Sequence, residues 1–109
     1  MDNNEFLAMY GEYAGRLDVA LKAGTDDDVA DAANELANLL GVRYLSCVNH
    51  RRTLDVEFIA ARDGYEDYKK LARMACEIDN AEDARVKAEK TLKTHTRIFE
   101  ALAKSRGAD

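Results

Sequence analysis

The chain of 109 residues contains no proline and no tryptophan, and it has only two cysteines. Because proline interrupts both helices and sheets, its absence favours long, uninterrupted helices. Cys47 and Cys76 are too few for a disulfide scaffold, so we expect reduced thiols. No apolar run approaches the roughly 18 residues that span a membrane, and the N-terminal residues show no charged-then-apolar pattern typical of a signal peptide. We therefore expect one cytoplasmic domain, covering residues 1–109, and no membrane partner.

Motifs that carry chemistry are also missing. The sequence has no glycine-rich phosphate loop, no Cys-x-x-Cys and no His-Glu-x-x-His. Cys47 and His50 are one helical turn apart, but their spacing matches no standard zinc site and no third residue is evident to orient them. The carboxylates of Glu57, Glu66 and Asp67 are expected to face solvent. We thus predict no catalytic residue, no metal site, no cofactor and no enzymatic activity.

What the chain does have is helical periodicity, which is clearest at its end. Asp79 and Glu82 resemble a capping box, and Gly107 stands where a helix would stop. Between them the sequence is rich in Ala, Lys, Glu and Arg, all good helix formers. Steps of four and three residues, typical of a coiled-coil seam, connect seven positions: Ala81, Arg85, Ala88, Leu92, His95, Phe99 and Leu102. We predict an amphipathic helix over residues 80–106.

Two shorter helices are predicted upstream. The first has the same rhythm from Phe6 to Ala20 and ends at Gly24. Thr25 is a capping residue for the second, and the three acids at 26–28 fit its first turn better than a metal cluster, since no later Glu completes a calcium site. Gly41 is expected to end this second helix.

Residues 42–60 support two interpretations. Residues 42–48 have a strand-like composition and residues 53–58 alternate polar with apolar, so a β-hairpin with a turn at 49–52 is one of them. The other is a helix, because the four-and-three rhythm runs unbroken from Leu54 to Ala75. We favour the helix, followed by a turn near residues 79–80; a continuous helix with a local stammer is the alternative there.

The predicted fold is therefore all-α: an antiparallel, coiled-coil-like helical bundle with two shorter N-terminal helices. The alternative is an α+β fold with a β-hairpin at about 42–60. A thin helical hairpin cannot cover its own apolar stripes, so we expect a homodimer that also binds a protein partner. Eight residues form the predicted oligomer or partner seam: Leu54, Phe58, Tyr65, Tyr68, Leu92, His95, Phe99 and Leu102.

Charge is unevenly distributed along the chain, whose net charge is −5. Residues 1–38 carry nine acids and two bases, whereas residues 81–109 carry five acids and seven bases. A nucleic-acid accessory role is the alternative function, through a basic face on the last helix and the bases at 51–52. Six residues make up this face: Arg51, Arg52, Lys90, Lys93, Arg97 and Lys104. The negative net charge ranks this role second.

The last third of the chain resembles small helical proteins encoded by bacteriophages and prophages. The resemblance rests on the stretch 79–85, on Leu92-Lys93 and Arg97, and on the closing residues 100–105, Glu-Ala-Leu-Ala-Lys-Ser. His95 departs from the apolar residue usual in those proteins. They are mostly of unassigned function, so the resemblance implies an origin, with a host factor as the partner to be inhibited or redirected in the host cytoplasm.

Overall fold

The computed structural model describes residues 3–50 and 56–107, and over these residues it consists of four α-helices and no strand. They are α1 (Asn3–Ala23), α2 (Asp26–Asn49), α3 (Val56–Ala75) and α4 (Ala81–Gly107). The predicted all-α fold is confirmed. The two N-terminal helices, α1 with 21 residues and α2 with 24, are shorter than α4 with 27 but slightly longer than α3 with 20.

The hairpin alternative is wrong for the described part of residues 42–60, because 42–49 belong to α2 and 56–60 belong to α3. Gly41 does not end α2 as predicted. A Cβ at Gly41 would lie 2.9 Å from the ring of Tyr65, so the glycine admits that ring while the helix continues to Asn49. The predicted turn after α3 is confirmed, since α3 ends at Ala75 and α4 begins at Ala81.

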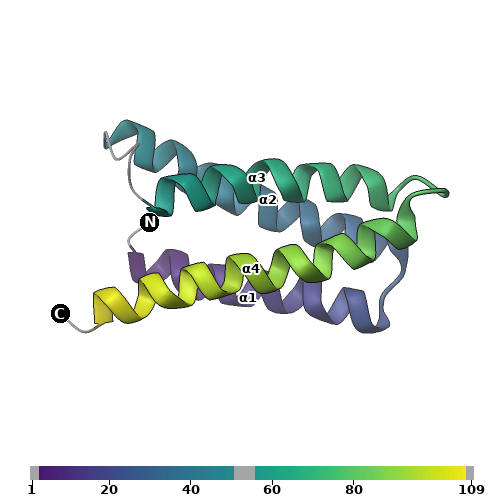
Figure 1. Ribbon diagram of the computed structural model, residues 1–109, viewed down its shortest axis with the longest axis horizontal. Coiled ribbons are helices and arrows are strands. Elements are labelled where there is room, and N and C mark those ends of the chain that lie inside the picture. The colour runs from purple at the N-terminus through teal and green to yellow at the C-terminus, as the bar shows by residue number, and fades with distance from the viewer. Residues whose placement is uncertain (1–2, 51–55, 108–109) are drawn as a thin grey trace.

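The four helices form an antiparallel bundle of 45 × 23 × 20 Å. Figure 1 shows α2 and α3 side by side in one layer, and α1 and α4 in the other. The start of α1 and the end of α4 lie at the same end of the bundle as the end of α2 and the start of α3. Each layer therefore consists of two antiparallel neighbours, and the core lies between the layers.

Local signals define the connection between α1 and α2. Thr25 accepts a hydrogen bond from the backbone N–H of Asp28, and the Asp28 side chain accepts one from the N–H of Thr25. This capping box confirms the structural role expected for the acids at 26–28. Arg85 of α4 donates to Asp26 and to the carbonyls of Leu21 and Gly24. Arg85, the charged residue in the four-and-three pattern of the last helix, thus ties α4 to the α1–α2 turn.

The core is built from side chains of all four helices. Phe6 and Tyr10 of α1 pack on Phe99 of α4, with ring centroids 5.4 Å and 4.7 Å from it. Leu36 and Leu40 of α2 are fully buried in the same cluster. Burial of this kind contributes roughly 1.5–3 kcal/mol per large apolar side chain, so helices that are marginal alone become stable together.

Candidate functional site

The predicted seam is used inside the protomer. Five of its side chains are buried in the bundle: Phe58, Tyr68, Leu92, His95 and Phe99. Leu102 is partly buried against the core, Tyr65 is exposed, and Leu54 lies outside the described residues. Phe58, for example, stacks on Tyr44 of α2 with the ring centroids 5.2 Å apart. A surface for a second chain must therefore be sought elsewhere on the folded protomer.

One carboxylate expected in solvent is buried. Glu57 has no exposed surface, and its Oε1 lies 3.0 Å from both Nε and Nη2 of Arg43, which is itself only 4% exposed. The thiol of Cys47 lies 3.6 Å from the same oxygen. The expectation that Glu57 faces solvent is wrong, because this glutamate shares the inner stripe of α3 with Gly64, and charge alone does not decide which face a residue occupies.

Arg43 and Glu57 join α2 to α3 at the end of the bundle where α2 ends. The guanidinium carbon of Arg43 also lies 5.0 Å from the ring centroid of Phe6 on α1. Cys47 and His50 do not come together, since the Cys47 side chain is buried whereas His50 is exposed and its Nδ1 lies 2.7 Å from the carbonyl of Ser46. Nothing in this arrangement brings a nucleophile and a base to a common opening.

A second buried polar group lies at the centre of the bundle. The Nε2 atom of His95 lies 3.5 Å from Asp67, while its Nδ1 meets no hydrogen-bond partner among the described residues. The ring of Tyr68 lies beside it, and the hydroxyl of Tyr68 is likewise buried without such a partner there. Burial raises the pKa of Tyr68 far above its usual value and also raises that of Tyr10.

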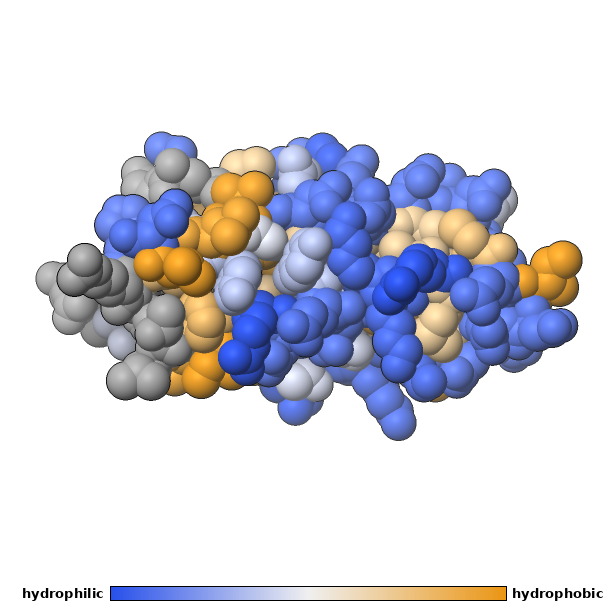
Figure 2. Space-filling model, turned by 90° about the horizontal axis from the view of Figure 1, so that it is seen from above, coloured by the Kyte–Doolittle hydropathy of each residue, from blue (hydrophilic) through white to orange (hydrophobic). Residues whose placement is uncertain are grey.

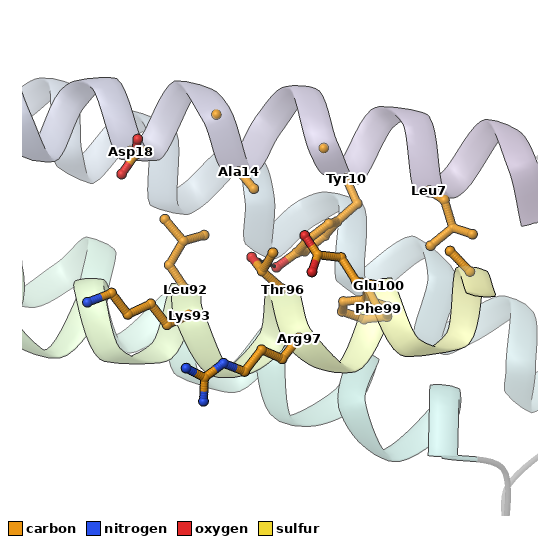
Figure 3. Close-up of a pocket in the computed structure, with 13 residues that line it drawn as sticks. Leu7, Tyr10, Ala14, Asp18, Leu92, Lys93, Thr96, Arg97, Phe99 and Glu100 are labelled. Carbon is orange, nitrogen blue, oxygen red and sulfur yellow. Dashed lines mark hydrogen bonds between the residues drawn. The ribbon is translucent and has the colours of Figure 1, made fainter. Parts of the chain in front are cut away.

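An apolar opening of the described surface lies between α1 and α4. It is a groove of about 570 Å³, drawn in Figure 3. Its α4 wall is formed by side chains between residues 92 and 103. Its α1 wall is formed by Leu7, Tyr10, Gly11, Ala14, Gly15 and Asp18. Periodicity predicted the amphipathic helices but gave no sign that these two would remain partly separated.

Small residues on α1 account for the groove. A Cβ placed on Gly11 or Gly15 would meet no described atom within 4 Å, so neither glycine is filled by a neighbouring helix. The floor is formed where the Tyr10 hydroxyl and the Thr96 hydroxyl meet at 3.1 Å, and Figure 3 shows this contact midway along the groove. The sequence signal for the groove is the Gly-Glu-Tyr-Ala-Gly stretch at 11–15, which helical periodicity alone does not reveal.

Charged side chains beside the groove point in different directions. Figure 3 shows the Glu100 carboxylate directed across the groove toward Tyr10 and Thr96, whereas the Arg97 guanidinium extends away from it. Glu100 forms no ion pair with a residue that the structure describes, while Asp18 pairs with Lys22 and Lys93 pairs with Glu89. Asp18, Lys93, Arg97 and Glu100 all line the groove. Of these four, Glu100 is the one that points across the groove and has no ion pair among the described residues.

Exposed apolar side chains gather at one end of the bundle. Figure 2 shows them where α2 ends and α3 begins. We call the following residues the apolar end cluster: Val42, Leu45, Val48, Val56 and Ile59, between 39% and 59% exposed. Other exposed apolar residues, such as Val19 and Val86, lie elsewhere on α1 and α4.

The predicted basic face is exposed where the structure describes it. Lys90, Lys93, Arg97 and Lys104 all have exposed side chains on α4, and Arg51 and Arg52 lie outside the described residues. Among residues 3–50 and 56–107, no group of three or more His, Cys, Asp or Glu side chains is placed to hold a metal ion. None of the described helices is both long enough and apolar enough to cross a membrane.

Comparison of the chain with protein-family models, with curated proteins and with solved structures gave no significant match.

Proposed function

We propose that the protein is a non-enzymatic helical protein that self-associates and acts by binding another protein. The observation that carries the proposal is the apolar end cluster. Each of its five side chains is more than a third exposed in the protomer, and they gather at one end of the molecule. Contiguous apolar surface on a soluble protein is typical of a contact with another chain. Two copies joined through the same cluster would form a closed, two-fold dimer.

Light scattering over a concentration series tests the self-association. We expect the wild-type chain to have the mass of a dimer, and the double variant Val42→Gln/Leu45→Gln to have that of a monomer. Both side chains are 57% exposed, and glutamine favours helix at least as well as valine, so the fold should be kept. Helical circular dichroism of the variant verifies this.

The matched control is Val19→Gln/Val86→Gln, which removes two equally exposed apolar side chains outside the cluster. This control should remain a dimer. A wild-type chain that stays monomeric at every concentration, or a control that dissociates as readily as the cluster variant, would contradict the proposal. The resemblance of the last third of the chain to phage proteins makes a bacterial host factor the partner class to search for.

The alternative function is nucleic-acid binding through the exposed basic face of α4. Four bases on one helix give it a physical basis, and the net charge of −5 ranks it second. Replacing Lys90, Lys93, Arg97 and Lys104 by glutamine separates the two functions. A nucleic-acid binder would lose affinity steeply with salt, and the variant would flatten that slope. We expect no salt-dependent binding to DNA or RNA and an unchanged dimer.

A further inference from the structure

We propose that the groove between α1 and α4 binds one amphipathic helix of another protein, which enters with its apolar face and places a Lys or Arg beside Glu100. The proposal rests on the proposed protein-binding role but not on self-association, because the groove is a different surface from the apolar end cluster. Three features of the groove support this binding mode: its length, its wall of small residues and the carboxylate of Glu100.

The dimensions suit a helix. From Leu7 to Asp18 the α1 wall extends roughly 17 Å at 1.5 Å per residue, which matches three turns of a partner helix. Gly11 and Gly15 contribute no side chain, and a Cβ at either would meet no described atom within 4 Å. Small residues let two helix backbones approach closely, as in helix pairs packed through glycine. Recognition of an apolar helix face by a groove of this kind is a recurring binding mode.

The charge facing the groove selects a basic residue. Glu100 is directed over the groove beside the ring of Tyr10 and has no ion pair among the described residues. A carboxylate attracts an ammonium or guanidinium group through its charge and through charge-assisted hydrogen bonds. The net charge of −5 would also favour the approach of a basic partner.

Other occupants fit less well. A second copy joined by a two-fold axis would place groove against groove, and two hollows facing each other remain unfilled. A head-to-tail contact between copies would continue into an open chain of molecules. Small-molecule sites bury most of the ligand, whereas this groove is open to solvent. A single helix from another protein fills the groove along its length, leaves no facing hollow and forms no open chain of molecules.

Two synthetic helical peptides serve as probes. Both carry Leu and Ala at positions i, i+3, i+4 and i+7 of one face, and they differ at one central position on the border of that face, which is Lys in one and Glu in the other. Binding of the fluorescein-labelled peptides to the full chain is followed by anisotropy. We expect the Lys peptide to bind about two- to fivefold more tightly than the Glu peptide, the effect of one partly exposed ion pair.

A filled groove is the decisive variant. Gly15→Leu adds a side chain into open space and improves helix propensity, so the fold should remain while affinity for the Lys peptide falls at least about tenfold. Ala8→Leu, an exposed α1 position outside the groove, is the matched control and should bind as the wild type does. Glu100→Gln should remove the preference for Lys over Glu, whereas Glu66→Gln on α3 should preserve it.

Several results would overturn the proposal. These results are the absence of binding by both peptides, binding to Gly15→Leu that is as tight as binding to Ala8→Leu, and a preference for Lys that survives in Glu100→Gln. Binding of decylammonium that Gly15→Leu abolishes, with no peptide binding, would make the groove a small-molecule site instead. A change in oligomeric mass caused by Gly15→Leu alone would assign it to a second copy. None of these results depends on Val42 or Leu45, so failure here is distinguishable from failure of the proposed self-association.

Discussion

Glycine has opposite roles in the two layers of the bundle. In the α2–α3 layer, a Cβ on Gly41 would lie 2.9 Å from the ring of Tyr65, and one on Gly64 would lie 2.5 Å from Leu40 and 3.3 Å from His95. In the α1–α4 layer, a Cβ on Gly11 or Gly15 would touch nothing described. The same residue type allows close packing in one layer and leaves a groove in the other.

The difference indicates which layer supplies stability and which supplies surface. Every glycine inside a helix costs roughly 0.5–1 kcal/mol relative to alanine. In α2 and α3 that cost is offset by close side-chain packing and by the buried pair of Arg43 and Glu57. In α1 no described atom lies close enough to Gly11 or Gly15 to offset it, which agrees with the proposed use of the groove by a partner.

The largest expected effect comes from breaking the buried ion pair of the closed layer. Arg43→Leu removes a cation that lies 3.0 Å from the buried Glu57, and loss of one partner of such a pair costs about 3–5 kcal/mol. Urea denaturation should show a correspondingly lower free energy of unfolding. The double variant Arg43→Leu/Glu57→Leu should recover most of it, because both charges of the buried pair are then replaced by apolar side chains. A single variant as stable as the wild type would show that the pair contributes little.

The next effect compares glycines directly. Gly64→Ala forces its methyl group against Leu40 and His95, and the overpacking of about 1–3 kcal/mol exceeds the gain in helix propensity of about 1 kcal/mol. We expect a net loss of about 1 kcal/mol in the free energy of unfolding. Gly15→Ala has only the propensity gain, so it should stabilise the protein by about 0.5–1 kcal/mol.

Thermal and urea unfolding of Gly64→Ala and Gly15→Ala, measured side by side, give the change in the free energy of unfolding for each variant. Opposite signs are the expected result. Equal destabilisation by both substitutions would mean that α1 and α4 are as closely packed as α2 and α3. That result would contradict the presence of a groove between α1 and α4.

The smallest effect concerns the tyrosine where the two layers meet. Burial raises the pKa of Tyr68 above the ordinary value of 10.0, which the unfolded chain has. Below pH 10.0 the Tyr68 hydroxyl is therefore neutral in both states, and its contribution to stability is fully present. Above that pH the unfolded chain releases the proton while the folded chain retains it, and stability is lost as the pH rises. Tyr68→Phe should therefore make the alkaline loss less steep and change stability at neutral pH by less than about 1 kcal/mol, since the hydroxyl has no hydrogen-bond partner among the described residues.

The loss of stability is measured by denaturation curves at neutral and alkaline pH. Ultraviolet absorbance follows the ionisation of tyrosine in the same samples. Tyr10→Phe is the paired control on α1. It removes the 3.1 Å contact with Thr96 and should cost about 1 kcal/mol at neutral pH. A Tyr68→Phe variant whose alkaline loss matches that of the wild type would contradict the assignment.

The sequence by itself determined the helices. The four-and-three periodicity, the Thr25 cap and the turn before Ala81 are local properties of the chain, and all three are present in the structure. Periodicity also marked Phe58, Tyr68 and Phe99 as residues of an apolar seam. It could not tell whether the seam would meet another helix of the same chain or a second chain, because both bury the same stripe equally well.

Only the tertiary structure decided the rest. Glu57 is buried because Arg43, fourteen positions away, is brought to its carboxylate. Gly41 lies inside a helix because Tyr65 fills the space beside it, overriding the local tendency of glycine to end one. The α1–α4 groove exists because two glycines face open space rather than a neighbour. Each depends on which residues distant in sequence become neighbours, which local patterns do not specify.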